Sequence, residues 1–135
     1  MPLTPFTTLR ENAPVLEGLT GWRVVADPAS LDELKGMTLR FAPDDALVLG
    51  EVEVAVGDPE AIVERDSGWV ALRVIEGRAL DLIATHALWR VPPGRPMLVQ
   101  GLLAGLPAKV YLDGSESMII VAAPFGHELE ERLGT

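Results

Sequence analysis

The chain contains two histidines, His86 and His127, whose side chains are the ones best suited to acid–base or metal chemistry near neutral pH. His86 lies beside the apolar stripe of a predicted helix, where it could act as a general base or bind a metal. The simpler interpretation is a histidine at the edge of the core that packs its ring and keeps one edge in solvent. We favour this structural interpretation and assign His86 no catalytic role.

His127 lies in the first turn of the last predicted helix, and Glu128, Glu130 and Glu131 follow it closely. These side chains could form a His/Glu metal site. Acidic side chains near the start of a helix also interact favourably with the helix dipole. We favour the dipole interpretation, so the sequence predicts no metal ligand here.

Three serines lie beside acidic residues: Ser67 follows Asp66, and Ser115 and Ser117 flank Glu116. A nucleophilic serine on a strained turn typically carries the pattern Gly-x-Ser-x-Gly, which this chain lacks. Serines in turns more often bond the neighbouring main chain. We therefore predict no hydrolase and no catalytic residue.

Four carboxylates near predicted turns could bind a cationic ligand: Asp44, Asp45, Glu64 and Asp66. Charged and polar residues are common in turns for local reasons. The turn interpretation is therefore favoured, and the sequence predicts no cofactor-binding residue.

The three tryptophans are Trp22, Trp69 and Trp89, and burial in the core is the default expectation for each. Trp89 is followed by Arg90 and a Pro-Pro-Gly loop. Tryptophan and arginine are enriched among the residues that dominate binding interfaces. Trp89 is therefore the aromatic residue that we associate with a protein interface.

Composition limits the classes of function. The chain has 135 residues, 48 % of them apolar, and its 11 basic and 20 acidic residues give a net charge of −9. This charge repels phosphate backbones, so we expect no nucleic-acid partner. There is no cysteine, which excludes disulfides and cysteine-ligated metals. We see no signal-peptide pattern and no membrane-spanning apolar run, so we expect a cytoplasmic protein without a membrane partner.

The elements that position these residues are predicted to be mostly strands. Residues 1–21 are interpreted as an N-terminal arm with a helical turn near 14–18. Ser30, with Glu33 three residues later, predicts a capped helix over 30–35. Alternation of apolar residues and turn formers predicts the other segments of this half: strands 22–26, 38–42, 46–50 and 51–56, a strand or short helix 61–65, and a turn 66–68.

The second half contains the clearest helix. Apolar residues recur at helical spacing over 77–89, which predicts one amphipathic helix. Residues 118–123 form a continuous apolar run, which is typical of a central strand covered on both faces. The other predicted elements are strands 69–75, 97–104 and 108–112, with a last helix 125–133.

These elements predict an α+β fold. Residues 39–49 and 110–120 share a hairpin pattern, and a helix precedes each hairpin. We therefore expect a mixed, mostly antiparallel sheet with helices packed on one face, with a duplicated strand–helix–hairpin unit as a hypothesis. The length predicts one domain over residues 1–135, made of the arm 1–21 and an α+β domain 22–135.

Three stretches carry a resemblance to a known family. Residues 39–50 are similar to its leucine-x-x-Gly-Pro-Asp-Glu-Trp-leucine hairpin, and residues 61–84 to its Asp-x-Ser strand, turn and helix. Residues 92–95 and 100–107 resemble its Pro-Pro-Gly loop and Gln-Thr-x-Leu-Ala strand. The chain thus resembles the gamma-subunit family of heterotetrameric sarcosine oxidase. That family falls within the superfamily of folate-binding aminomethyltransferase domains that are similar to the glycine-cleavage T-protein.

The resemblance implies a subunit that is not an enzyme on its own. Flavin, NAD and folate would be bound by partner subunits, and this chain would pack against larger oxidoreductase subunits. It would carry no catalytic, cofactor-binding or metal-binding residue.

Two alternatives remain open at this stage. One is a small module that binds folate or another ligand, for which Glu64 or Asp66 would supply the carboxylate. The other is a self-associating homodimer of unknown role.

Overall fold

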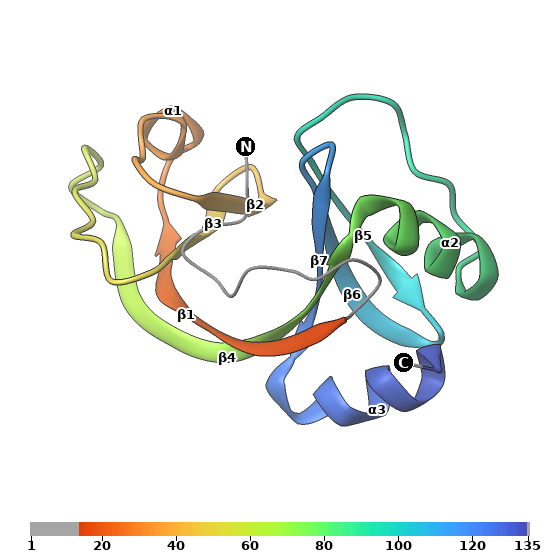
Figure 1. Ribbon diagram of the computed structural model, residues 1–135. Coiled ribbons are helices and arrows are strands. Elements are labelled where there is room, and N and C mark those ends of the chain that lie inside the picture. Colours follow the sequence, from red (N-terminus) through yellow and green to blue (C-terminus); the bar gives the residue numbers. More distant parts are fainter. Residues whose placement is uncertain (1–13, 135) are drawn as a thin grey trace. The chain divides into compact units, whose positions relative to one another are not determined.

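The structure, a computed structural model, describes residues 14–134 (Figure 1). The predicted α+β class is confirmed. The elements in chain order are β1 (Val15–Val25), α1 (Pro28–Asp32), β2 (Thr38–Ala42), β3 (Asp45–Leu49), β4 (Ile62–Ile75), α2 (Glu76–His86), β5 (Met97–Leu103), β6 (Leu106–Leu112), β7 (Glu116–Ala122), the 3-10 turn η1 (Ala123–Phe125) and α3 (Gly126–Leu133).

The seven strands are hydrogen-bonded in the order β2-β3-β1-β4-β7-β6-β5. The pairs β1–β3, β2–β3, β4–β7, β5–β6 and β6–β7 are antiparallel. The mostly antiparallel sheet expected from the sequence is therefore present, and short turns join its hairpins, as antiparallel pairing permits.

The chain divides into two compact units. Unit 1 contains residues 14–18 and 69–134 of the described chain, and unit 2 contains residues 19–68. The long strands β1 and β4 each contribute residues to both units. The single domain expected from the length stays a prediction.

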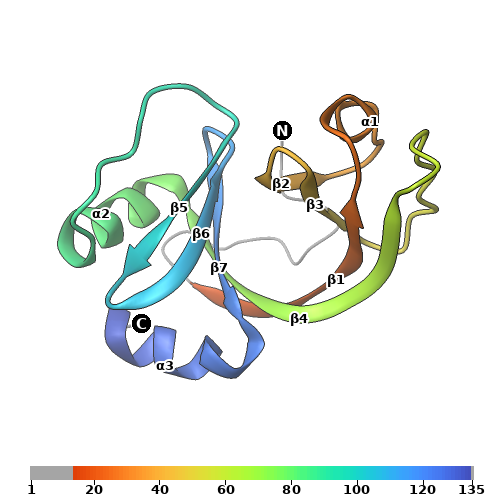
Figure 2. The same ribbon diagram turned by 180° about the vertical axis from the view of Figure 1, so that it is seen from behind.

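The core of unit 1 lies between its sheet and two helices (Figure 2). Leu72 of β4 and Ile119 of β7 are paired residues on one sheet face, and both pack in the same cluster as Leu82 of α2 and Leu129 of α3. Both helices therefore cover the same face, as the sequence predicted. The expected central strand is β7, which lies between β4 and β6 and is fully buried from Met118 to Val121.

A two-residue turn joins β5 to β6. Ala104 and Gly105 have φ values of 51° and 81°, the positive pair that a type I′ hairpin turn requires. The predicted bounds 97–104 and 108–112 are corrected accordingly, because the turn closes at Leu103 and Leu106. Pro107 is accommodated inside β6 opposite Leu102.

Helix α2 ends at His86, three residues before the predicted end at 89. Ala87 is already extended, although its N–H still bonds the Ile83 carbonyl. The main-chain N–H of Ala104 donates to the carbonyl of His86 at 2.9 Å, which fixes the helix end against the β5–β6 turn. Trp89 therefore lies in the loop after the helix.

The first correction in the N-terminal region concerns residues 15–21. They were expected to be an arm with a helical turn near 14–18, but β1 begins at Val15 and continues to Val25. Gly21 pairs with Leu49 of β3, so extended pairing replaces the local turn. The remainder of the predicted arm, residues 1–13, lies outside the described residues.

The short helix begins earlier than predicted. The Asp27 carboxylate accepts the Ser30 N–H at 2.7 Å, so Asp27 and not Ser30 is the N-cap. Pro28 occupies the first turn, where its fixed φ suits the helix and its missing N–H costs nothing. The helix therefore spans Pro28–Asp32 in place of 30–35.

Two further predictions for unit 2 are wrong. Residues 51–56 alternate in polarity, yet they form an irregular segment, because Val54 and Val56 pack against the cluster around Leu31 of α1. Residues 66–68 are not a turn but lie inside β4, which runs without interruption from Ile62 to Ile75.

The strand pairing agrees with the hypothesis of a duplicated unit. In β1-α1-β2-β3 the last strand pairs with both other strands, and the same holds for β4-α2-β6-β7. Trp22 lies opposite Val48 in the first repeat, and Leu72 lies opposite Ile119 in the second. Strand β5 and helix α3 are additions to the second repeat.

Candidate functional site

Arg73 is the buried charged side chain of the described chain, with 1 % of its surface exposed. It lies on β4 between Glu17 of β1 and Glu116 of β7, with N···O distances of 3.7 and 3.3 Å to the two carboxylates. Burying a charge is costly unless opposite charges and hydrogen bonds compensate for lost water. Arg73 therefore links three strands through ion pairs within unit 1.

Arg23 forms a similar group in unit 2. Its Nε and Nη2 atoms donate to the two carboxylate oxygens of Asp45 at 2.6 and 2.7 Å, and Nη1 lies 3.4 Å from Asp66. Its guanidinium carbon lies 4.9 Å from the ring centre of Phe41. The pKa of Arg23 is raised, chiefly by the hydrogen bond with Asp45, so this cation stays charged.

The two arginines occupy equivalent positions in the two repeats. Trp22 of β1 and Leu72 of β4 hold corresponding positions opposite the last strand of their repeats, and Arg23 and Arg73 are the residues that directly follow them. In each repeat the acidic partner lies on the last strand, Asp45 on β3 and Glu116 on β7. The duplicated unit thus carries a duplicated arginine–carboxylate pair.

These contacts involve two of the four carboxylates that were candidates for binding a cationic ligand. Asp45 and Asp66 bind the chain's own Arg23. Asp44 and Glu64 are exposed, and the structure does not bring all four together. Two of the four carboxylates considered for a cationic ligand therefore bind an internal cation instead.

A third arginine, Arg65, packs over an aromatic ring. Its guanidinium carbon lies 4.9 Å from the ring centre of Trp22, and its nitrogens contact the Glu51 carboxylate at 3.0 and 3.2 Å. The pKa of Glu51 is lowered, chiefly by its hydrogen bond with Arg65. Trp22 thus serves as a stacking surface as well as a packing residue of unit 2.

The predicted serines have structural partners or lie on the surface. The Ser115 hydroxyl and main-chain N–H both bond Oδ1 of Asp113, at 3.1 and 2.8 Å. The buried Ser117 hydroxyl donates to the Val74 carbonyl at 2.9 Å. Ser67 is exposed on β4.

The Pro-Pro-Gly loop is fastened to a neighbouring turn. Nε of Arg95 and the main-chain N–H of Gly114 both donate to Oε1 of Glu76, at 2.8 and 3.0 Å. Arg95 also donates to the Gly94 carbonyl at 2.6 Å. One carboxylate at the start of α2 therefore holds the loop against the β6–β7 turn.

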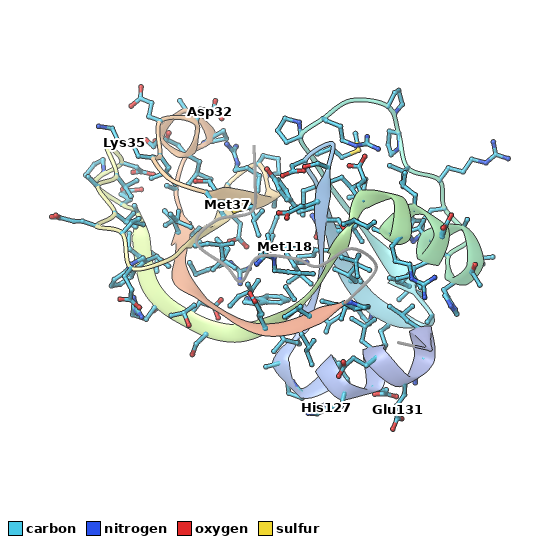
Figure 3. The ribbon with its side chains drawn as sticks, viewed as in Figure 1. Asp32, Lys35, Met37, Met118, His127 and Glu131 are labelled. Atoms are coloured by element: carbon cyan, nitrogen blue, oxygen red, sulfur yellow. The ribbon has the colours of Figure 1, made fainter. Side chains whose placement is uncertain are left out.

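The histidines lie on different elements of unit 1. His86 is half-buried at the end of α2, and His127 is 95 % exposed on α3, where its Nδ1 lies 3.4 Å from Glu130. His127 and Glu131 are labelled on α3 in Figure 3. Between residues 14 and 134, no three His, Asp or Glu side chains converge as a metal site would require.

Trp89 packs on the strand that follows its loop. Its indole N–H donates to the Leu102 carbonyl at 2.8 Å. A Cβ atom added to Gly101 would lie only 2.6 Å from the indole nitrogen, so the ring needs the glycine there. Trp89 is half-buried, while the neighbouring Leu88 is fully exposed.

A groove of about 270 Å³ lies in unit 2 and is lined by Glu33, Leu34, Lys35, Glu53, Val54 and Ala55. Lys35 is labelled beside α1 in Figure 3. The groove lining contains none of the residues singled out from the sequence for ligand binding.

Sequence reasoning missed both arginine groups. Arg23 and Arg73 are each the charged residue in an otherwise apolar run of a strand, residues 22–26 and 69–75. An isolated charge in such a strand, with a carboxylate available on a later strand, is the signal that could have revealed them.

The comparisons with known proteins add one partial similarity. The chain is 29 % identical over 120 residues to the DNA mismatch repair protein MutS of Granulibacter bethesdensis. The match covers 84 % of this chain but only 12 % of MutS, so the chain spans a small part of that relative. No family model matches the chain, and no solved structure matches it. Among the helices of residues 14–134, none has the length and apolar character needed to cross a membrane.

Proposed function

We propose that this chain is a non-catalytic accessory subunit that packs against a larger oxidoreductase subunit. This is the role implied by its resemblance to the gamma-subunit family of sarcosine oxidase. In this proposal flavin, NAD and folate are bound by the partners, and this chain contributes a folded surface.

The observation that carries the proposal is the set of large apolar side chains exposed to solvent. Apolar side chains left in water are available for burial against a partner protein. The exposed residues are Val25, Val52, Ile62, Val63, Leu88, Leu102 and Phe125.

The internal ion pairs support the same role. Arg23 and Arg73 each link neighbouring strands, and Arg95 fastens a loop. Carboxylates that bind arginines of their own chain act as structural cross-links. Such a scaffold suits a subunit that presents a fixed surface.

Co-expression with a large oxidase-like subunit tests the proposal. We expect the two proteins to co-purify in a fixed ratio through size-exclusion chromatography. Migration as a monomer, together with unchanged oxidase activity when this chain is left out, would contradict it.

The folate-binding alternative is tested by calorimetry with tetrahydrofolate. Asp66, one of its two candidate carboxylates, already contacts Arg23, and Glu64 is exposed. We expect no heat of binding at millimolar ligand, and a saturable heat would favour the ligand-binding module.

DNA is a necessary control ligand because of the partial similarity to a DNA mismatch repair protein. The excess of 20 acidic over 11 basic residues repels the phosphate backbone. We expect no shift of a labelled duplex in a gel, and a salt-sensitive shift would argue against the accessory-subunit proposal.

A further inference from the structure

Strand β5 forms one edge of the sheet. Among residues 14–134 it pairs with β6 alone, and that pairing runs without a register shift from Met97 to Leu103 (Figure 2). The strand contains no charged residue and no proline. Proteins usually protect a sheet edge with charges, proline or a bulge, because an unprotected edge is a template for another strand. β5 therefore lacks the usual protection.

Strand β2, at the other edge, is protected. It has five residues, carries the charged Arg40, and shifts its register between Arg40 and Ala42. β5 has seven residues and neither feature. This difference identifies β5 as the edge able to accept a further strand.

The outward main-chain groups of β5 follow from its hairpin with β6. Leu103 and Leu106 flank the two-residue turn, and residues in that position exchange main-chain hydrogen bonds. Hydrogen-bonded and non-hydrogen-bonded pairs then alternate along the ladder. The N–H and C=O groups of Leu98, Gln100 and Leu102 therefore point away from β6, at the spacing that an extended strand matches.

Two features restrict how a second strand can lie along this edge. The Leu102 carbonyl already accepts the Trp89 indole N–H at 2.8 Å. Pro96, just before the strand, has no N–H to donate. If a second copy of β5 runs antiparallel about a two-fold axis at Val99, its Pro96 falls opposite Leu102. The occupied carbonyl then faces the residue without a donor, so this register requires no hydrogen bond that the chain cannot make.

The surroundings of β5 also suit contact with a second copy of an acidic chain. Residues 82–112 contain no aspartate or glutamate, although the chain has 20 acidic residues and a net charge of −9. Two copies repel one another wherever their carboxylates approach. A contact along β5 instead brings together parts of the two copies that carry no acidic residue.

The cations of this acid-free span lie outside β5. Nε of Arg95 lies 2.8 Å from the Glu76 carboxylate, and Lys109 of β6 donates to the Gln100 side-chain oxygen at 2.8 Å. Arg90 is exposed in the loop after α2. Pairing of two β5 strands therefore places no like charges directly opposite each other.

We propose that this chain forms a homodimer in which β5 pairs antiparallel with β5 of a second copy, about a two-fold axis at Val99. Leu98 of each copy lies opposite Gln100 of the other, and their outward main-chain groups form the new hydrogen bonds. A two-fold contact of this kind uses the same residues twice and closes at two copies. The inference goes beyond the proposed function and does not depend on it.

Sedimentation velocity of the chain alone, over a range of concentrations, tests the homodimer. We expect a dimer that dissociates on dilution. Gln100→Pro removes an outward N–H that the ladder with β6 does not use. It should raise the dissociation constant at least about tenfold, because each copy loses a hydrogen bond. The control Gln100→Ala keeps the N–H and should change the constant less than about threefold. Circular dichroism and thermal melting establish that both variants are folded.

The register has a separate test, because the chain has no cysteine of its own. In the proposed pairing the two copies of Val99 lie directly opposite, with Cα atoms about 4.5 Å apart, which permits a disulfide. Val99→Cys should therefore cross-link into a dimer under mild oxidation. Leu102→Cys should not, because the two copies of that position lie about 20 Å apart along the paired strands.

A wild-type chain that stays monomeric at every concentration, or a Gln100→Pro dimer as tight as the wild type, would overturn the proposal. Cross-linking through Leu102→Cys but not through Val99→Cys would overturn the assigned register. A monomer whose co-purification with a large oxidase-like subunit is lost on Gln100→Pro would also overturn the homodimer, because the edge would then accept a strand of that subunit.

Discussion

At the scale of single residues, the arginines do the most to connect the strands. Arg73 is buried, while Arg23 and its partner Asp45 are more exposed to solvent. The two ion-paired groups should therefore contribute differently to stability. A buried charge depends on its partners far more than an exposed one does.

Replacing Arg73 tests this dependence. Arg73→Ala leaves Glu17 and Glu116 without this cation and should lower the free energy of unfolding by about 3–5 kcal/mol. Urea denaturation measures the change. The control Arg90→Ala, at an exposed position, should change it by less than about 0.5 kcal/mol. Similar effects for both variants would contradict the structural role of Arg73.

Asp27, the N-cap of α1, should make the stability of the folded chain depend on pH. The pKa of Asp27 is lowered in the folded chain, so the folded state favours the charged form. Its contribution to stability is therefore present above the ordinary aspartate pKa of about 4, and it is lost as pH falls through the lowered value.

Asp27→Asn isolates that contribution, because asparagine also caps helices but does not titrate. We expect the wild type to lose stability more steeply than Asp27→Asn when urea denaturation is repeated from neutral pH to about pH 2. Parallel curves for the two proteins would show that Asp27 contributes nothing to the acid response.

At the scale of elements, the contact between Trp89 and β5 explains a residue that looks unremarkable in the sequence. Gly101 lies inside a strand, where glycine normally weakens the pairing. The indole of Trp89 occupies the space that a Cβ would need.

Two glycine variants test this contact, one expected to lower stability and the other to raise it. Gly101→Ala should lower stability by about 1–3 kcal/mol and alter tryptophan fluorescence, because the indole must move off the strand. Gly77→Ala, in α2 with open space around it, should raise stability by about 0.5 kcal/mol. Thermal melting and fluorescence spectra measure both effects, and a neutral Gly101→Ala would contradict the packing described.

Elements with a strong local pattern could be predicted from the sequence. The apolar run that became β7, the amphipathic α2 and the hairpin of β2 and β3 were placed to within a few residues. In each of them the side chains bury the face that their own spacing defines.

The remaining elements depend on distant partners. Residues 51–56 alternate as a strand does, but their valines are buried against α1 without sheet pairing. Residues 66–68 resemble a turn, but Asp66 contacts Arg23 of β1 and the strand continues. Of the candidate site, the sequence supplied Asp45 and Asp66 but not Arg23, because their proximity arises only from the pairing of β1 with β3 and β4.

At the scale of the whole molecule, two strands serve both compact units. β1 supplies residues 15–18 to unit 1 and residues 19–25 to unit 2, and β4 is divided in the same way at residue 69. Breaking either strand therefore removes contacts from both units.

We accordingly expect one cooperative unfolding transition. Variants that keep only Trp22, in unit 2, or only Trp89, in unit 1, can report on each unit separately by fluorescence. The two midpoints in urea should coincide, as two-state unfolding requires. Well-separated midpoints would show that the units unfold independently.

The paired arginines have a consequence for any attempt to cut the chain in two. Asp66 of the second repeat contacts Arg23 of the first, and Glu17 of the first contacts Arg73 of the second. A fragment ending at residue 61 would keep the Arg23–Asp45 pair but lose Asp66, and its complement would keep the Arg73–Glu116 pair but lose Glu17. Each repeat supplies one carboxylate to the arginine of the other, so separating the repeats would break one ion pair in each.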